Sequence, residues 1–488
     1  MSHAVVAVLP PAALAVVDDG TAPPRRWRTP VVYGVLVGLP LAVTVLVLRS
    51  VDGAGTVVAP AVTRLGAGTL APAQVLPRLL LAAVVIAVAA HLGGTLLARL
   101  GQPPVIGEMA AGFLLGPSLL GTLAPGLTEA LLPPGVMPYL DVLAQLGVVF
   151  FMFGVGWELP LALVRSVRST AVVVAHASIA TPLLLGVLLA LALPASYRPA
   201  GVPRLHFALF VGLALSMTAF PVLARILHDR GLSGTRLGAL GMAVAGIGDV
   251  TAWCGLVLVV TIARGGGSLV LLRTVLLTAL FLAAMWWVVR PLLARLFASG
   301  TSDTTGSAVA LLAVLLLSAA TTDLIGIHAV FGAFLAGAVM PRGAPRVTGF
   351  CFRLEGLTCW LLLPLFFATV GLRTDLREVV GSTGWPVLLA VVAVAVTGKL
   401  VGASVASRAM GIDRRTALGV GVLMNCRGLT EIVVLNVGLS LGVIGRPLFT
   451  VLVAMALLTT AMTGPLLSRL RLDPGAARAT PLPQELAP

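Results

Sequence analysis

Asp249 is the residue whose position most clearly calls for a chemical role. It lies in the middle of an apolar run from about residue 237 to 262, and about 20 such residues cross the hydrocarbon core of a bilayer. A carboxylate at mid-membrane costs roughly 2.5 kcal/mol or more, so we do not expect it to serve only for holding helices together. We therefore infer that Asp249 binds a cation or a proton.

Lys399 is the second residue with an unusual position. The chain has 32 lysines and arginines, and Lys399 is the one lysine among them; it lies well inside the apolar run 391–402. Arginine effectively cannot lose its proton in a protein, whereas a buried lysine can. The pattern favours an ammonium that can deprotonate, and the alternative is a lysine that snorkels to the end of its span.

Two apolar segments carry interrupting residues at their centres. In the first, Pro221 removes a backbone donor, and the hydroxyls of Ser216 and Thr218 could satisfy the freed carbonyl groups. An ordinary proline kink is the alternative here.

The second segment holds Asn425, Arg427 and Glu431 within two helical turns. A structural ion pair between Arg427 and Glu431, four residues apart, is the alternative here. Interrupted segments at corresponding positions of two halves point to an inverted repeat with a site at the membrane midplane. If spans three to seven form one half and ten to fourteen the other, each interrupted span is fourth in its half.

Composition places these residues in an all-α polytopic membrane protein. The 488 residues are 58% hydrophobic and 10% charged, and the mean hydropathy is +1.07. The net charge of +14 does not indicate nucleic acid, because the arginines are scattered singly between apolar runs. The four cysteines lack metal-ligand spacing, so we expect no cofactor and no chemistry from Cys254, Cys351, Cys359 and Cys426.

Counting apolar stretches of roughly 17 to 25 residues predicts about fourteen spans. Arginines gather in alternate loops, and this bias predicts that both termini lie in the cytoplasm. We expect the chain to cross the inner (plasma) membrane of the cell. We expect a tail over 1–30, an additional span and outer loop over 31–75, the main membrane domain over 76–470, and a tail over 471–488. The predicted spans lie near 31–49, 76–98, 103–121, 138–159, 170–193, 206–228, 236–263, 269–297, 306–322, 325–340, 357–372, 385–406, 415–439 and 447–470.

Six stretches, in this order, together form a specific pattern. They are GQPPVIGEMAAGFLLGP (101–117), TAFPVLARIL (218–227), DVTAW (249–253), GIHAVFGAFLAG (326–337), LPLFF (363–367) with GLRTD (371–375), and NCRGLTE (425–431). The pattern resembles the second monovalent cation:proton antiporter family, in its Kef-like and plant cation/H+ exchanger-like branch.

The resemblance implies a thirteen-span core, here with one extra N-terminal span, made of a dimerisation domain and a mobile core domain. Two interrupted helices would cross beside the ion-binding aspartate, which corresponds to Asp249, and the family's core lysine corresponds to Lys399. Gly248 departs from the family, which usually carries Asp or Asn there to pair with the lysine. Lys399 could then turn to Asp249, Glu431 or water.

These features predict a homodimeric transporter, not an enzyme, that exchanges Na+ or K+ for H+ by alternating access. Asp249 would bind cation and proton in turn, with Thr218 and Ser216 as neutral oxygen ligands, and one carboxylate favours electroneutral exchange. Electrogenic exchange follows if Lys399 also releases a proton.

Two other functions are compatible with parts of the sequence. Proton-coupled efflux of an organic solute or ionophore-type compound would use the same scaffold. Gly246–Asp249 spells the Gly-x-Gly-Asp signature of intramembrane aspartyl proteases, but the second carboxylate that such catalysis needs has no counterpart.

Five further residues have weaker patterns. Glu108, after the break at Pro103-Pro104, is either a packing carboxylate or a support for the site. We expect His328 to be a core histidine and Asp323, where the family often has Glu, to be solvated in a turn. His91 and Glu158 are expected at the membrane interface.

Overall fold

The computed structural model describes residues 28–51, 72–100, 102, 104–158, 169–232, 235–263, 268–298, 304–327, 329–342, 344–372, 374 and 384–470. Within these residues all regular structure is helical, and eleven helices are long and apolar enough to cross a membrane. Leucines and valines are exposed in rows on α2, α3 and α13, which is typical of surfaces that face lipid. The chain is therefore an all-α, multi-pass membrane protein.

The helices of the first half begin with α1 (Arg28–Tyr33), η2 (Gly34–Gly38), α2 (Leu39–Arg49), α3 (Pro72–Arg99), α4 (Pro104–Leu115), α5 (Leu120–Leu123), α6 (Pro125–Leu131), η3 (Pro134–Val136) and α7 (Met137–Glu158). They continue with α9 (Thr170–Ala192), η4 (Ala195–Tyr197), α10 (Arg204–Ser216), α11 (Phe220–Asp229) and α12 (Arg236–Ala263).

The second half contains α13 (Ser268–Ala284), η5 (Met285–Val289), α14 (Arg290–Ala298), α15 (Thr304–Ile325), α16 (Ala329–Val339), α17 (Pro345–Leu357), η6 (Thr358–Leu362) and α18 (Leu363–Leu372). It ends with α20 (Gly384–Ala409), α21 (Arg414–Met424), α22 (Leu429–Ser440) and α23 (Arg446–Arg469).

The predicted spans coincide with these helices, with two kinds of difference. The sixth and thirteenth spans are each two short helices, α10 with α11 and α21 with α22, so both predicted interruptions are present. The eleventh span begins near Pro345 and not at 357, because the arginines and the glutamate of α17 hide its helix from an apolar count. The total of fourteen spans stays a prediction, as do the domain limits; the tails 1–27 and 471–488 and residues 52–71 lie outside the described residues.

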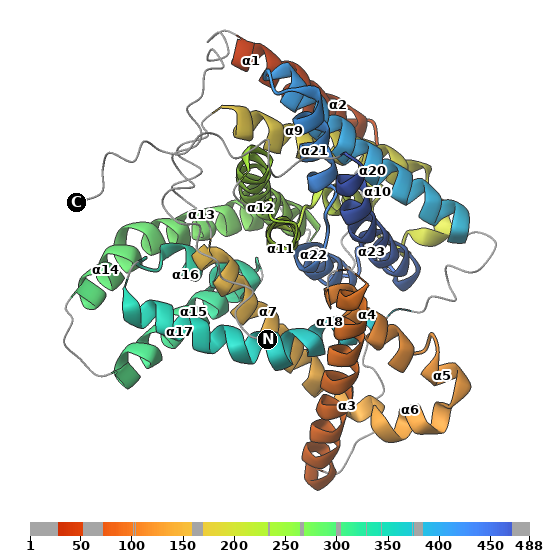
Figure 1. Ribbon diagram of the computed structural model, residues 1–488, viewed down its shortest axis with the longest axis vertical. Helices are drawn as coiled ribbons and strands as arrows, with labels where there is room; N and C mark the ends of the chain where they lie inside the picture. Colours follow the sequence, from red (N-terminus) through yellow and green to blue (C-terminus); the bar gives the residue numbers. More distant parts are fainter. Residues whose placement is uncertain are drawn as a thin grey trace.

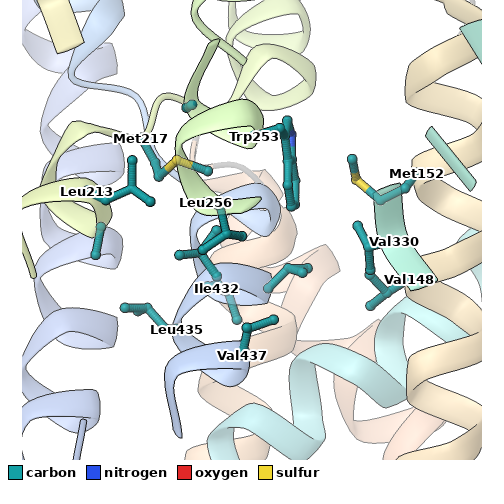
Figure 2. Packing of buried hydrophobic residues seen from close by; sticks show 14 of the residues in the cluster. Val148, Met152, Leu213, Met217, Trp253, Leu256, Val330, Ile432, Leu435 and Val437 are labelled. Carbon is teal, nitrogen blue, oxygen red and sulfur yellow. The ribbon is translucent and has the colours of Figure 1, made fainter. Parts of the chain in front are cut away.

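The helices form two groups (Figure 1). In one, α9 packs against α10, α12 and α20, and α1, η2 and α2 lie along its outer side. In the other, α7 packs against α16 and α18, α4 packs against α3 and α18, and α15 packs against α16. The two groups meet in a large apolar core. Figure 2 shows side chains of α10, α12 and α22 on one side of it and of α7 and α16 on the other, with Trp253 between them.

Small residues bring α20 close to α9. A Cβ atom at Gly398 would lie 2.9 Å from the Cα atom of Pro182, and one at Gly402 would lie 2.8 Å from the carbonyl oxygen of Ala177. Glycine is needed at both positions because α9 occupies the space that a side chain would fill. The close contact sets the depth of Lys399, which lies between the two glycines.

Candidate functional site

Asp249 lies in the middle of α12 and is only 2% exposed. Neither of its carboxylate oxygens makes a hydrogen bond to the described residues. Its electrostatic neighbours are the backbone amide of Phe220, at the first residue of α11, and the ammonium group of Lys399. Most buried polar groups in proteins are paired, so this carboxylate has acceptor capacity that a proton or a cation could use.

The first interruption separates α10 from α11 at Met217, Thr218 and Ala219. The Thr218 hydroxyl donates to the carbonyl oxygen of Met424 at 3.2 Å. The amide of Ala219 donates to the carbonyl oxygen of Cys426 at 3.1 Å. The two interrupted helices are therefore bonded to each other where both are unwound, which satisfies backbone groups that lipid could not.

The second interruption runs from Asn425 to Gly428. From it, the Arg427 side chain extends to the end of α10, beside the first interruption. The Arg427 guanidinium donates to the carbonyl oxygens of Ala214 at 3.3 Å and Leu215 at 2.6 Å, which belong to the last turn of α10. It also pairs with Glu431 at 2.7 Å, and both side chains are fully buried. The predicted ion pair is thus present, and in addition Arg427 caps the neighbouring half-helix.

Lys399 completes the cap of α10. Its ammonium donates to the carbonyl oxygen of Ser216 at 2.5 Å and to the Thr218 hydroxyl at 2.7 Å. The lysine is fully buried, so it does not snorkel to a span end. Its hydrogen bonds go to neither Asp249 nor Glu431, the two protein partners considered from the sequence, although both carboxylates lie within electrostatic range.

The charges follow the dipoles of the half-helices. A helix C-terminus carries partial negative charge and an N-terminus partial positive charge. Lys399 and Arg427 stand at the C-terminus of α10, Glu431 stands in the first turn of α22, and Asp249 faces the N-terminal amide of α11. Each buried charge therefore meets the helix end of opposite sign.

The remaining predicted residues differ in the part that their side chains take in the site. The Ser216 hydroxyl donates to the carbonyl oxygens of Gly212 and Ile179, so it is the Ser216 carbonyl that reaches Lys399. Asn425 is buried at the second interruption, with no hydrogen bond from its side-chain amide to the described residues. A Cβ atom on Gly248 would have no atom within 4 Å, so the missing family side chain leaves space open. Pro221 is the second residue of α11, where a missing N–H costs nothing.

The groups with weaker patterns are not brought to Asp249. Glu108 is half-buried on α4 and its side chain lies beside Gly94 of α3. Asp323 is exposed, as predicted, but it lies in the last turn of α15 and not in the connecting turn. His91 is exposed on α3. His328 and the side chain of Glu158 lie outside the described residues.

Two threonines that were not predicted from the sequence bind backbone groups of the two interruptions. The Thr460 hydroxyl, on α23, donates to the carbonyl oxygen of Arg427 at 2.6 Å and accepts from its amide at 3.0 Å. The Thr430 hydroxyl donates to the carbonyl oxygen of Thr218 at 3.4 Å. The pair Thr459-Thr460 inside an otherwise apolar span was the available signal.

A narrow recess, with room for about one water molecule, lies beside the second interruption on the side of α4. It reaches the buried Arg427, and apart from Thr460 its other walls are apolar. It is lined by Val105, Ile106, Met109, Val222, Arg427, Gly428, Ile432, Ala456, Leu457 and Thr460. The described residues contain no cluster of three or more histidines, cysteines or carboxylates that could hold a resident metal.

An all-helical membrane protein in which two interrupted helices meet beside a buried carboxylate has the architecture of a secondary ion transporter. The model of the sodium/hydrogen exchanger transmembrane family matches residues 84–471, and the chain belongs to this family. It is a transporter and not an enzyme, which removes the protease interpretation.

Individual relatives agree with the family. The Na(+)/H(+) antiporter NhaS4 of Synechocystis is 39% identical over 80% of this chain and 97% of its own length. Cation/H(+) antiporter 19 of Arabidopsis thaliana is 38% identical over 80% of this chain, and the K(+)/H(+) antiporter 1 of Saccharomyces cerevisiae is 34% identical over 75%. The match spans only 49% and 43% of these two longer proteins.

A solved structure shows the same fold. The sodium proton antiporter MjNhaP1 of Methanocaldococcus jannaschii superposes with a TM-score of 0.55, covering 82% of this chain and 99% of that one at 15% identity.

Proposed function

We propose that this protein exchanges a monovalent cation, Na+ or K+, for H+ by alternating access, with Asp249 binding cation and proton in turn. The observation that carries the proposal is the burial of Asp249 with both carboxylate oxygens free of hydrogen bonds to the described residues, beside two crossing interruptions. The names of the relatives, which include Na(+)/H(+) and K(+)/H(+) antiporters, support it.

The chemistry follows from competition for one carboxylate. A buried carboxylate is costly when it is charged and unpaired, so it is stable only with a proton or a cation bound. Thr218 and backbone carbonyls of the interruptions would supply neutral oxygen ligands, which suit Na+ and K+. The Ser216 hydroxyl is a weaker candidate than the sequence suggested, because it is directed to carbonyl oxygens of α9 and α10.

We propose electroneutral exchange. Lys399 is held by a carbonyl and a hydroxyl of the first interruption rather than by the transported ion's carboxylate. Its ammonium therefore serves as a fixed cap of α10, and Asp249 is the one group that trades its proton. One proton for one monovalent cation moves no net charge.

Alternating access would come from movement of the group around α9, α12 and α20 against the group around α7, α16 and α18. We further propose the homodimer in the inner membrane, with cytoplasmic termini, that the arginine distribution and the family resemblance predict.

Vesicles with an imposed pH gradient test the proposal. Addition of Na+, K+, Li+ or Rb+ should collapse the gradient in vesicles with the wild-type protein and not in those with Asp249→Asn. Asp323→Asn, which neutralises an exposed carboxylate, is the matched control and should transport normally. A wild-type protein that responds to none of the four cations would refute cation exchange and favour proton-coupled efflux of an organic solute. A rate that depends on membrane potential at a fixed pH gradient would refute electroneutrality.

A further inference from the structure

Three side chains form a hydrogen-bonded chain from the N-terminal helices to the helix of Asp249. Tyr33 is the last residue of α1, His176 lies on α9 and Thr251 lies on α12. The Tyr33 hydroxyl is 3.1 Å from Nδ1 of His176, and the Thr251 hydroxyl is 3.2 Å from Nε2. The rings of Tyr33 and His176 also meet edge to face, with centroids 5.7 Å apart. The chain ends two residues from Asp249, on the same helix.

The N-terminal helices precede the region that the family model matches, which begins at residue 84. They are nevertheless built into the group that holds the site: α1, η2 and α2 pack on α9, and Val37 belongs to the same buried core as residues of α9, α12 and α21. The π-helical turn η2 begins directly after Tyr33. Such turns are uncommon and are frequent at functional sites.

The hydrogen bonds around His176 favour one tautomer of its neutral ring. The one proton of the Thr251 hydroxyl is donated to the carbonyl oxygen of Ile247 at 2.9 Å. The tautomer that keeps this bond has the proton on Nε2, because Thr251 then accepts from His176. In the neutral ring Nδ1 is then an acceptor, and the Tyr33 hydroxyl donates to it. The neutral Nε2–H form satisfies every bond of the chain.

A second proton on His176 would put a positive charge on this half-buried ring. Nδ1 would become a donor, and the Tyr33 hydroxyl would have to turn its proton away and accept from it, whereas the bond to Thr251 would remain. The helices packed on α9 carry these charged or titratable side chains in their described parts: Arg49 on α2, Arg204 and His206 on α10, Arg236, Asp249 and Cys254 on α12, and Lys399 and Arg408 on α20. The hydrogen bonds of His176 go to Tyr33 and Thr251 and not to any of them.

We propose that neutral His176 is a positioning residue, which ties the N-terminal helices to α12 and so keeps Asp249 in its working position. Protonation of His176 places a charge between these helices that its two neutral partners do not compensate, and this charge loosens α1 from α9 and α12 and slows exchange at acidic pH. The proposal rests on the exchange function proposed above.

The test measures exchange against pH in proteoliposomes at saturating cation, where competition between cation and proton at Asp249 no longer sets the acidic limb. In His176→Gln the amide can still accept from Tyr33 and donate to Thr251 but cannot gain a proton. Its acidic midpoint should lie about 0.5 pH unit or more below that of the wild type. In Tyr33→Phe both forms of the ring lose their hydrogen-bond partner on α1, so the maximal rate should fall. His206→Gln, a half-buried histidine on α10, is the control and should follow the wild type.

Midpoints that coincide in all four proteins, with only the maximal rate lowered, would overturn the proposal, and so would an equal shift in His206→Gln. A readout independent of transport is solid-state NMR of the full-length protein with ¹⁵N-labelled histidine, in which His176→Gln identifies the His176 signals. We expect the neutral Nε2–H tautomer at pH 7.5, and an Nδ1–H or charged ring would overturn the proposal. This readout stands even if the wild type exchanges no cation, a result that would refute only the proposed function.

Discussion

Replacing Lys399 by methionine tests the most unexpected feature of the site, the binding of the lone lysine to the end of α10. Methionine keeps the length of the side chain and removes the ammonium, so the Ser216 carbonyl and the Thr218 hydroxyl lose their donor. Thr218→Val removes the hydroxyl alone. The double variant shows whether the two changes share one interaction.

The magnitude follows from the geometry. Both contacts of Lys399 are short, at 2.5 and 2.7 Å, and all three residues are buried. A hydrogen bond to a charged group contributes about 1.5–3 kcal/mol. We therefore expect Lys399→Met to lower the free energy of unfolding by about 3 kcal/mol or more, and we expect a coupling of about 1.5–3 kcal/mol with Thr218→Val.

The assay is equilibrium unfolding in mixed micelles, followed by tryptophan fluorescence. Ser178→Ala supplies the control, because Ser178 is a buried hydroxyl on α9 that donates to the carbonyl oxygen of Ala175 and does not bind Lys399. Its effect should add to that of Lys399→Met within about 0.5 kcal/mol. Coupling below that value between Lys399→Met and Thr218→Val would refute the capping role.

Three further predictions concern other charges. Arg427→Gln should lower the free energy of unfolding by about 3–5 kcal/mol, because it leaves Glu431 buried without its cation. Glu431→Gln should cost less in the same unfolding assay. A larger cost for Glu431→Gln than for Arg427→Gln would contradict the pairing. Asp249→Asn should keep or raise the thermal midpoint while exchange is lost, since it removes an unpaired buried carboxylate; a fall of several degrees would show that the carboxylate holds the fold. Asp413 caps α21 by accepting from the Thr416 amide at 2.9 Å, so Asp413→Ala should cost about 1 kcal/mol at pH 7. Burial raises the pKa of Asp413, but the bonds from Thr416 outweigh it and hold the pKa below its ordinary value of 3.8. The stabilisation is therefore complete above about pH 4 to 5 and lost as the pH falls through the lowered pKa, and unfolding curves of Asp413→Ala and wild type should converge in acid.

The helices were predictable because a bilayer admits few backbone solutions. A stretch that must satisfy its own hydrogen bonds in lipid is a helix, and apolar length alone locates it. The same reasoning located both interruptions, since Pro221 and the cluster from Asn425 to Glu431 would be too costly in an unbroken helix that faces lipid. It did not locate α17, because the two arginines and the glutamate of this helix interrupt the apolar run on which the count depends.

The partners within the site were harder to predict. From the sequence, the expected partners of Lys399 were Asp249, Glu431 or water, because attraction between opposite charges is the interaction that residue types suggest. The partners are a backbone carbonyl and a hydroxyl, and a carbonyl is present at every residue, so no residue type marks it. Thr460 was not predicted for a similar reason, since a threonine in an apolar helix commonly bonds to its own backbone.

The sequence by itself determined that the protein is a helical membrane transporter, that Asp249 is stranded in an apolar span and that two spans are interrupted, because these properties are local and the bilayer penalises each of them. Only the tertiary structure decided which charges meet which helix ends. In the sequence, Lys399 and Arg427 each lie roughly 180 to 210 residues from the α10 C-terminus that they bind. The contact of Lys399 depends on the close packing of α20 against α9, which the glycines of α20 permit. The chain from Tyr33 through His176 to Thr251 is of the same kind: each residue is unremarkable in its own helix, and their alignment exists only in the folded protein.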